Sequence, residues 1–190
     1  MIDDLGRWIA GSSSENAKYW DCSIEISEDQ GKSWSIHPIP FSHIEIKEAK
    51  EFGADGVIQP ALWQSSPFDF HCLMRSSKGY IYRSDSGDGG QTWCEAYPIS
   101  LPNNNSGISL VKTDGKRLVL AYNPVNANWG IRSPLSIAVS EDNGGTWTKC
   151  LDLETEPAEF SYPYLQWDGE TIDLVYTWKR KNIVHCEFVI

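Results

Sequence analysis

Three copies of one eight-residue pattern decide the fold: SEDQGKSW at Ser27–Trp34, SGDGGQTW at Ser86–Trp93 and SEDNGGTW at Ser140–Trp147. Each copy reads Ser-x-Asp-x-Gly-x-(Ser/Thr)-Trp. The copies start at positions 27, 86 and 140, and are therefore 59 and 54 residues apart. A motif that recurs every fifty-odd residues is typical of stacked copies of one supersecondary unit, in a solenoid or a propeller.

Each position of the pattern has a physical role in a tight turn. The Asp carboxylate can accept backbone N–H groups, and the Gly can take a positive φ. The Ser or Thr hydroxyl can bond back across the turn, and the Trp ring can pack the turn onto the layer beneath. We therefore predict a structural role for twelve residues. They are Ser27, Asp29, Gly31, Trp34, Ser86, Asp88, Gly90, Trp93, Ser140, Asp142, Gly144 and Trp147.

Composition narrows the class of function. The chain has 190 residues, 41% of them apolar, with nine Trp, which is ample for the core of one domain. The net charge is −10, and acidic and basic residues are interspersed. Without a basic patch to neutralise phosphates, neither a nucleic acid nor an anionic membrane is an expected partner. The four His residues lack metal-ligand spacing, so we expect no metal and no cofactor.

The ends and the cysteines indicate a cytoplasmic protein. No apolar run approaches the roughly 18 residues of a membrane span, and the start, MIDDLGRWIA, lacks the pattern of a signal peptide. The five cysteines are odd in number and widely spaced, which predicts buried, reduced thiols rather than a disulfide framework.

The segments between the repeats have the pattern of short β-strands. These segments are 57–63, 70–74, 80–83, 118–122, 135–139, 172–178 and 183–190. Asp-Gly pairs at 114–115 and 168–169 predict tight hairpins. Only 44–52 has the pattern of a short helix, of one or two turns in a loop. The predicted class is all-β.

The repeats are identified as Asp-boxes, or BNR repeats, of sialidase-like β-propellers. Further stretches resemble the C-terminal half of bacterial and fungal sialidase-family proteins, and together they cover nearly the whole chain in order. They are WIAGSSSE (8–15), GVIQPALW (56–63), MRSSKGYIYRS (74–84), LPNNNSG (101–107), YNPVNANWGIRSPLSIAVS (122–140), EFSYPYLQ (159–166) and VYTWKRKNIVH (175–185). The resemblance implies a six-bladed propeller with four strands in each blade.

Counting strands from the boxes predicts one incomplete propeller domain over residues 1–190. Two blades are complete, at about 56–98 and 107–153, and two are partial, at about 7–41 and 161–190. Open edges at both ends are not tolerated in a closed propeller. Either N-terminal blades outside this chain complete the ring, or two copies of the chain associate to close it.

In this family the loops opposite the Asp-boxes surround a central mouth. Strand counting places Gln59, Arg75, Arg132 and the loops 103–106 and 159–162 at that mouth. Sialidases hold the substrate carboxylate with three arginines, in bidentate geometry. By position, Arg75 and Arg132 match the second and third of these, and the first would lie in blades that the chain lacks.

The resemblance also implies a nucleophile and its activator. The activating glutamate of sialidases falls on Gln59, and the nucleophilic tyrosine falls on Phe160; neither replacement can perform that role. Tyr162 is a possible substitute. Glu15, Asp21 and Glu159 are the other candidate catalytic groups, since a facing pair of carboxylates can hydrolyse glycosides.

The remaining expectations concern the ligand. The candidate substrate-binding residues are Gln59, Arg75, Asn105, Arg132, Phe160 and Trp178. A sialidase-like glycoside hydrolase relative, with a carbohydrate ligand at the mouth, is the leading hypothesis. The alternatives are a non-catalytic carbohydrate-binding propeller and an inactive fragment of a longer enzyme.

Overall fold

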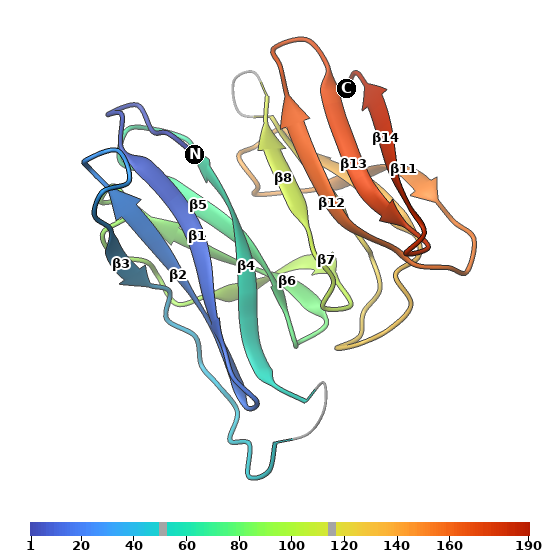
Figure 1. Ribbon diagram of the computed structural model, residues 1–190, viewed down its shortest axis with the longest axis horizontal. Helices are drawn as coiled ribbons and strands as arrows, with labels where there is room; N and C mark the ends of the chain where they lie inside the picture. The colour runs from blue at the N-terminus through green and yellow to red at the C-terminus, as the bar shows by residue number, and fades with distance from the viewer. Residues whose placement is uncertain (50–52, 114–116) are drawn as a thin grey trace. The chain divides into compact units, whose positions relative to one another are not determined.

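The computed structural model describes residues 1–49, 53–113 and 117–190 (Figure 1). These residues form fourteen strands and contain no helix, which confirms the all-β class. The helix expected over 44–52 does not form at 44–49, and 50–52 lie outside the described residues, as does the Asp-Gly pair at 114–115. The chain divides into two compact units, 1–100 and 101–190.

The first unit begins with three antiparallel strands, β1 (Trp8–Glu15), β2 (Tyr19–Ser27) and β3 (Ser35–Pro38). A meander follows, with β4 (Asp55–Gln64), β5 (Phe70–Ser76), β6 (Tyr80–Ser86) and β7 (Tyr97–Pro102) in that order across the sheet. These four strands are the expected complete blade, and β1–β3 supply the late strands of a partial one. The first core consists of residues such as Ile24, Val57 and Phe70.

A short parallel ladder joins the two groups of the first unit. Tyr19 pairs with Asp55, and Trp20 pairs with Gly56. Gly56 has a φ of 149°, and a Cβ built there would lie 1.9 Å from the carbonyl oxygen of Trp20. The backbones approach so closely that only glycine fits.

The second unit contains two sheets. The four-stranded sheet consists of β8 (Ser109–Lys112), β9 (Leu118–Tyr122), β10 (Leu135–Ser140) and β11 (Thr148–Glu154), and the three-stranded sheet of β12 (Phe160–Trp167), β13 (Ile172–Trp178) and β14 (Asn182–Phe188). The strand count per blade is as expected from the boxes. The first strands of the two sheets are joined where Leu165 N–H donates to Ser109 Oγ at 2.9 Å.

The second unit has its own core between these sheets. It includes Val119, Leu135, Ile137, Phe160 and Leu174, all fully or almost fully buried. Every residue of β9 and β10 is buried, which explains why these strands read as continuous apolar runs rather than alternating ones.

The Asp-boxes form the turns that the sequence predicted. Gly31, Gly90 and Gly144 have φ values of 86°, 87° and 80°. In the second box, Asp88 Oδ1 accepts from Thr92 N–H at 2.9 Å, and Asp88 Oδ2 accepts from the Thr92 hydroxyl at 2.6 Å. The first and third boxes repeat this geometry. These bonds stabilise the ionised carboxylate and lower the pKa of Asp88 to about 2.

Two features of the boxes and cysteines differ from expectation. Trp93 is buried, but Trp34 is 41% exposed, so the indole of the first box does not pack fully onto a layer beneath. Trp34 Nε1 still donates to Gly31 O at 3.2 Å, which fixes the ring against its own turn.

The cysteines also differ from expectation in their burial. All five are free thiols, but only Cys22 and Cys72 are buried.

Candidate functional site

In the first unit, the predicted residues Gln59 and Arg75 lie together. Arg75 is buried near the end of β5, and its Nη1 donates to Gln59 Oε1 at 3.2 Å. Gln59 lies in a bulge of β4, where the pairing with β5 shifts between Ile58 and Ala61, and it has a φ of 57°. Such a bulge re-aims a side chain, and here it directs Gln59 to the exposed surface beside Arg75.

The predicted carboxylates of the first unit do not form a facing pair. Glu15 pairs across the β1–β2 ladder with Trp20, whereas Asp21 pairs with Ser14. Because successive residues of a strand face opposite sides, the Glu15 and Asp21 side chains point to opposite faces of the hairpin. Asp21 Oδ1 instead lies 2.8 Å from His43 Nε2.

In the second unit, Arg132 is the centre of a polar cluster. It is only 7% exposed, and its backbone carbonyl accepts from Phe160 N–H at 3.0 Å. The guanidinium carbon lies 5.6 Å from the ring centroid of Trp129 and 5.0 Å from that of Tyr162. Both aromatic rings therefore attract the cation through their faces.

Glu159 is the counter-ion of this cluster. Its Oε1 lies 3.5 Å from Arg132 Nη1, and its Oε2 accepts from Arg180 Nε at 2.8 Å. Burial alone would raise the pKa of Glu159, but the Arg180 and Ser161 hydrogen bonds and the two guanidinium charges together lower it. Glu159 is therefore held ionised, and it is better suited to orient arginines than to protonate a leaving group.

Tyr162, rather than Phe160, presents its side chain at this cluster. Tyr162 lies in a bulge of β12, between Ser161 and Tyr164, with a φ of 52°, and it is 50% exposed. Phe160 is 0% exposed and lies in the core. The expectation that Phe160 contacts substrate is therefore wrong in this structure: its ring packs inward, where it stabilises the second unit.

Tyr162 and Gln59 are equivalent positions of two sheets. Each lies in a bulge of the first strand, has a positive φ and is followed by a proline, Pro163 or Pro60. A positive φ is unusual for a residue that is not glycine. Two sheets thus use the same irregularity to expose one polar side chain each.

The predicted loop 103–106 is a buried polar network. Ser106 Oγ lies 2.6 Å from Asn104 Oδ1 and 2.8 Å from Asn123 Oδ1, and its single proton is donated to one of these two oxygens. Asn104 Nδ2 donates to the carbonyl of Ile131 at 2.6 Å, and Asn105 Nδ2 donates to Asn128 Oδ1 at 3.1 Å. Asn105 is itself buried, so the network positions the loop that carries Arg132 rather than presenting amides to a ligand.

A cavity of about 220 Å³ opens beside the cluster. It is lined by Trp129, Gly130, Ile131, Arg132, Ala158, Glu159 and Arg180. The sequence did not single out Trp129 or Arg180. Trp129 lies three residues before Arg132 in WGIR, and Arg180 lies in the turn between β13 and β14, which only the hairpin register brings back to Glu159.

Trp178, the last predicted contact, is half-buried at the end of β13. Lys179 Nζ lies 4.2 Å from its ring centroid.

The structure brings together Arg132, Glu159 and Tyr162 in the second unit, and Gln59 and Arg75 in the first. That all of them share one mouth stays a prediction, since the groups belong to different units.

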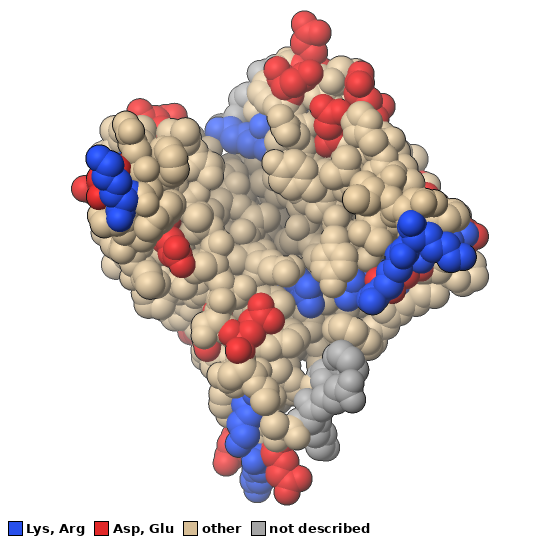
Figure 2. All heavy atoms as spheres, viewed as in Figure 1, with Lys and Arg blue, Asp and Glu red and all other residues tan. Residues whose placement is uncertain are grey.

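The described residues contain no group of three or more His, Cys, Asp or Glu side chains that could hold a metal ion. Across the same residues no helix is long and apolar enough to cross a membrane. Figure 2 shows that acidic and basic side chains gather in separate small groups on the face drawn, with tan surface between most of them.

A comparison with solved structures finds that several sialidases have folds similar to that of this chain. A Hadza microbial sialidase is 18% identical with a TM-score of 0.70, over 98% of this chain and 35% of that one. The Trypanosoma rangeli sialidase in complex with sialic acid is 15% identical with a TM-score of 0.65, over 92% and 28%. The intramolecular trans-sialidase from Ruminococcus gnavus is 22% identical with a TM-score of 0.64, over 97% and 41%.

At these identities the likeness shows the fold, and the chain spans less than half of each of these proteins. No curated protein matches the chain by sequence. The model of the BNR repeat-like domain matches residues 2–174, which is most of the chain. The chain therefore belongs to the BNR repeat-like domain family and has the β-sheet fold of the sialidase propellers.

Proposed function

We propose that this chain forms part of a glycan-binding site in which Arg132 binds the carboxylate of an acidic sugar such as sialic acid. One observation carries the proposal. Arg132 Nη1 is buried and has no hydrogen-bond partner among the described residues, although it lies within ion-pair distance of Glu159. A buried donor without an acceptor is costly, and a ligand carboxylate in the adjoining cavity would satisfy it.

The surroundings of Arg132 suit such a ligand. Arg132 and Arg180 outnumber Glu159, so the wall of the cavity keeps a net positive charge although the chain as a whole carries −10. A guanidinium can bind a carboxylate through two parallel hydrogen bonds. The rings of Trp129 and Tyr162 offer apolar faces against which a sugar ring can stack.

Hydrolysis is the second candidate, and Tyr162 favours it. Its half-exposed phenol lies beside Arg132, where a sugar held by the arginine would present its anomeric carbon. Gln59 cannot act as a base in the role of the sialidase glutamate. Since the chain spans under half of the sialidases to which it is similar, both activities are proposed for a propeller of which this chain supplies a part.

Binding can be tested by NMR titration of the full chain with N-acetylneuraminic acid and, as a matched ligand, with its methyl ester. The ester keeps the ring and hydroxyls but removes the negative charge. We expect the acid to shift the Arg132 and Trp129 signals and to bind at least ten-fold more tightly, because a charge-assisted hydrogen bond contributes about 1.5–3 kcal/mol. Equal affinity for the two ligands would contradict the proposal.

Catalysis is tested separately with a fluorogenic α-sialoside. If Tyr162 acts as nucleophile, wild-type chain releases the fluorophore and Tyr162→Phe does not, while both bind the free sugar. Turnover that is unchanged in Tyr162→Phe would exclude this role. Binding without turnover in either protein would leave the chain as a carbohydrate-binding propeller segment.

A further inference from the structure

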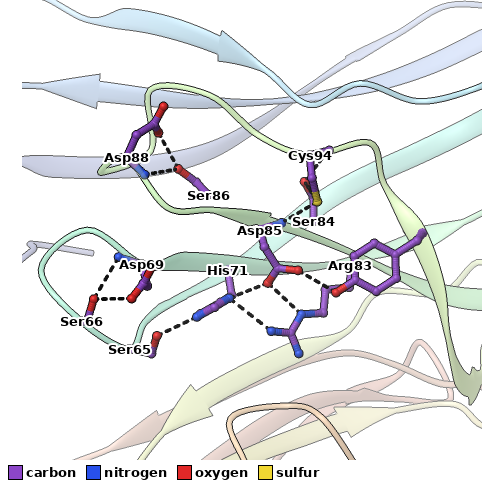
Figure 3. A network of polar contacts seen from close by, with 11 residues as sticks. Ser65, Ser66, Asp69, His71, Arg83, Ser84, Asp85, Ser86, Asp88 and Cys94 are labelled. Carbon is purple, nitrogen blue, oxygen red and sulfur yellow. Dashed lines mark hydrogen bonds and ion pairs between the residues drawn. The ribbon is translucent and has the colours of Figure 1, made fainter.

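A second cluster of reactive side chains lies in the first unit, where three strands meet (Figure 3). Ser65 follows β4, His71 is the second residue of β5, and Asp85 is the penultimate residue of β6. Ser65 Oγ lies 2.7 Å from His71 Nε2, and His71 Nδ1 lies 2.5 Å from Asp85 Oδ1. A hydroxyl, an imidazole and a carboxylate are thus connected in series, as in serine hydrolases.

This cluster shares no residue with the proposed glycan site, whose Arg132 and Tyr162 belong to the second unit, and within the first unit it also lies apart from Arg75. His71 and Arg75 are four residues apart on β5, which corresponds to about 13 Å along a strand. His71 lies next to the end of the β4–β5 hairpin, and Arg75 lies at the opposite end of the strand. The two sites can therefore be tested independently.

The proton positions in the cluster follow from Asp85. Burial would raise the pKa of Asp85, but hydrogen bonds from His71 and Tyr97 and the charge of Arg83 lower it to about 2. An ionised Asp85 can only accept, and its Oδ1 lies closer to His71 Nδ1, at 2.5 Å, than the donor Arg83 Nη2 does, at 3.2 Å, so we assign the shared proton to His71 Nδ1. In the neutral imidazole, Nε2 then has its lone pair directed at the Ser65 hydroxyl. This is the tautomer that a general base requires.

The surroundings hold the imidazole in this orientation. Asp85 Oδ1 also accepts from Arg83 Nε at 2.8 Å, and Asp85 Oδ2 accepts from the Tyr97 hydroxyl at 2.6 Å. His71 stacks on Trp63, with ring centroids 4.9 Å apart. His71 is buried, whereas Ser65 is exposed in the loop before β5. The solvent-accessible hydroxyl of Ser65 is therefore hydrogen-bonded to a buried imidazole, His71, whose orientation is fixed.

We propose that Ser65 is an activated nucleophile that accepts the acyl group of a small ester, with His71 as general base and Asp85 as the residue that positions His71. Ser65 Oγ attacks the ester carbonyl while its proton passes to His71 Nε2. The bond to the leaving oxygen breaks, and the alcohol or phenol departs with that proton. Water then hydrolyses the acyl-serine through His71, which releases the acid and restores Ser65.

The substrate class follows from the loop. Ser65 lies in a short exposed loop, closed by the bond from Ser65 N–H to Asp69 O at 3.0 Å, rather than in a deep pocket. Phe68, in the same loop, is 61% exposed and provides an apolar surface for an aryl leaving group. Aryl esters of short carboxylic acids fit this surface.

The same unit contains a natural control. Ser35 Oγ lies 2.8 Å from His37 Nε2, but His37 Nδ1 lies 2.9 Å from the backbone carbonyl of Gln91 rather than from a carboxylate. Ser35 and Ser65 therefore face the same ring nitrogen, and only Ser65 has an anion behind the imidazole. A difference in reactivity between them measures the contribution of Asp85.

The experiment is to treat the full chain with a fluorophosphonate, which phosphonylates activated serines with loss of fluoride, and to map the adduct by mass spectrometry. We expect one adduct, on Ser65, formed at least ten-fold faster than any on Ser35. We also expect hydrolysis of p-nitrophenyl acetate, lost in Ser65→Ala and reduced roughly 100-fold in Asp85→Asn. Ser35→Ala should react like wild type.

Two results would overturn the proposal: labelling of Ser65 no faster than that of Ser35, or ester hydrolysis that persists in Ser65→Ala. Because Asp85 also binds Arg83 and Tyr97, Asp85→Asn could unfold the sheet. The Ser65→Ala comparison does not depend on that variant, since Ser65 is exposed and its change is small. Melting curves of each variant show whether activity is lost because the general base no longer works or because the variant is unfolded.

Discussion

The guanidinium carbon of Arg132 lies 5.0 Å from the ring centroid of Tyr162, and both residues belong to the second unit. Arg132 comes from the loop before β10, whereas Tyr162 lies in the bulge of β12, thirty positions further along the chain. The buried network of residues 104–106 holds the loop that carries Arg132, and the positive φ of Tyr162 orients the Tyr162 side chain.

Removal of Arg180 should raise the pKa of Glu159. Glu159 Oε2 accepts from Arg180 Nε, and this bond is the first of the contributions that lower the pKa of the carboxyl. We expect the NMR-measured pKa of Glu159 to rise in Arg180→Ala. In the matched variant Lys181→Ala, the neighbouring exposed cation is removed and the pKa should stay where it was. An unchanged pKa in Arg180→Ala would show that the Ser161 hydrogen bond and the charge of Arg132 suffice to keep Glu159 ionised.

The Asp-boxes should make stability depend on pH in a defined window. The folded-state pKa of Asp88 is about 2, below the ordinary value of about 3.9. Its contribution is therefore present above pH 4 and is lost as the pH falls toward 2. We expect Asp88→Asn to lower Tm by about 2–4 °C at pH 7 and to have little effect near pH 2. Exposed Glu28 is the control: Glu28→Gln should not show this pattern.

Gly56→Ala should destabilise the first unit strongly. A Cβ at this position would lie 1.9 Å from the Trp20 carbonyl oxygen, so the β2–β4 ladder must open. We expect a loss of more than about 3 kcal/mol in the free energy of unfolding. Gly169→Ala is the matched control, because Gly169 also has a positive φ but a Cβ added there would meet nothing within 4 Å. Equal losses in the two variants would mean that backbone conformation, not the close approach, sets the cost.

Asn104→Ala should weaken ligand binding without touching the ligand. The Asn104 amide donates to the carbonyls of Gly130 and Ile131, next to Arg132. Leaving these groups unpaired costs about 1–3 kcal/mol, and the loop that carries Arg132 should lose its position. We expect lower Tm together with weaker sugar binding. If Asn104→Ala is destabilised but binds the sugar with wild-type affinity, the hydrogen bonds of Asn104 do not position Arg132 for binding.

Much of the fold could be predicted from the sequence, because its signals are local. The box residues Asp88 and Gly90 set their own turn, and the strands between boxes follow from short apolar runs. Phe160 and Tyr162 show where this reasoning fails. A bulge adds one residue to a strand and changes which side chain faces outward, and Pro163 is the only sign of it along the chain.

The polar clusters around Arg132 and His71 were harder to predict than the fold, because their contacts depend on which residues pair across neighbouring strands. Arg180 reaches Glu159 only through the turn between β13 and β14, and His71 meets Asp85 because these residues pair across β5 and β6. Neither pair has a characteristic spacing along the chain. Arg75 and Arg132 could be singled out only through the family resemblance.

The most direct test of the glycan-binding proposal is the dissociation constant of Arg132→Lys for N-acetylneuraminic acid, measured by NMR titration against wild type. Lysine keeps the charge but loses the planar pair of donors, so we predict binding at least ten-fold weaker. Arg117→Lys, at a surface ion pair with Glu141, is the control and should bind like wild type. Wild-type affinity in Arg132→Lys, or equal weakening in both variants, would contradict the assignment of Arg132 to the carboxylate.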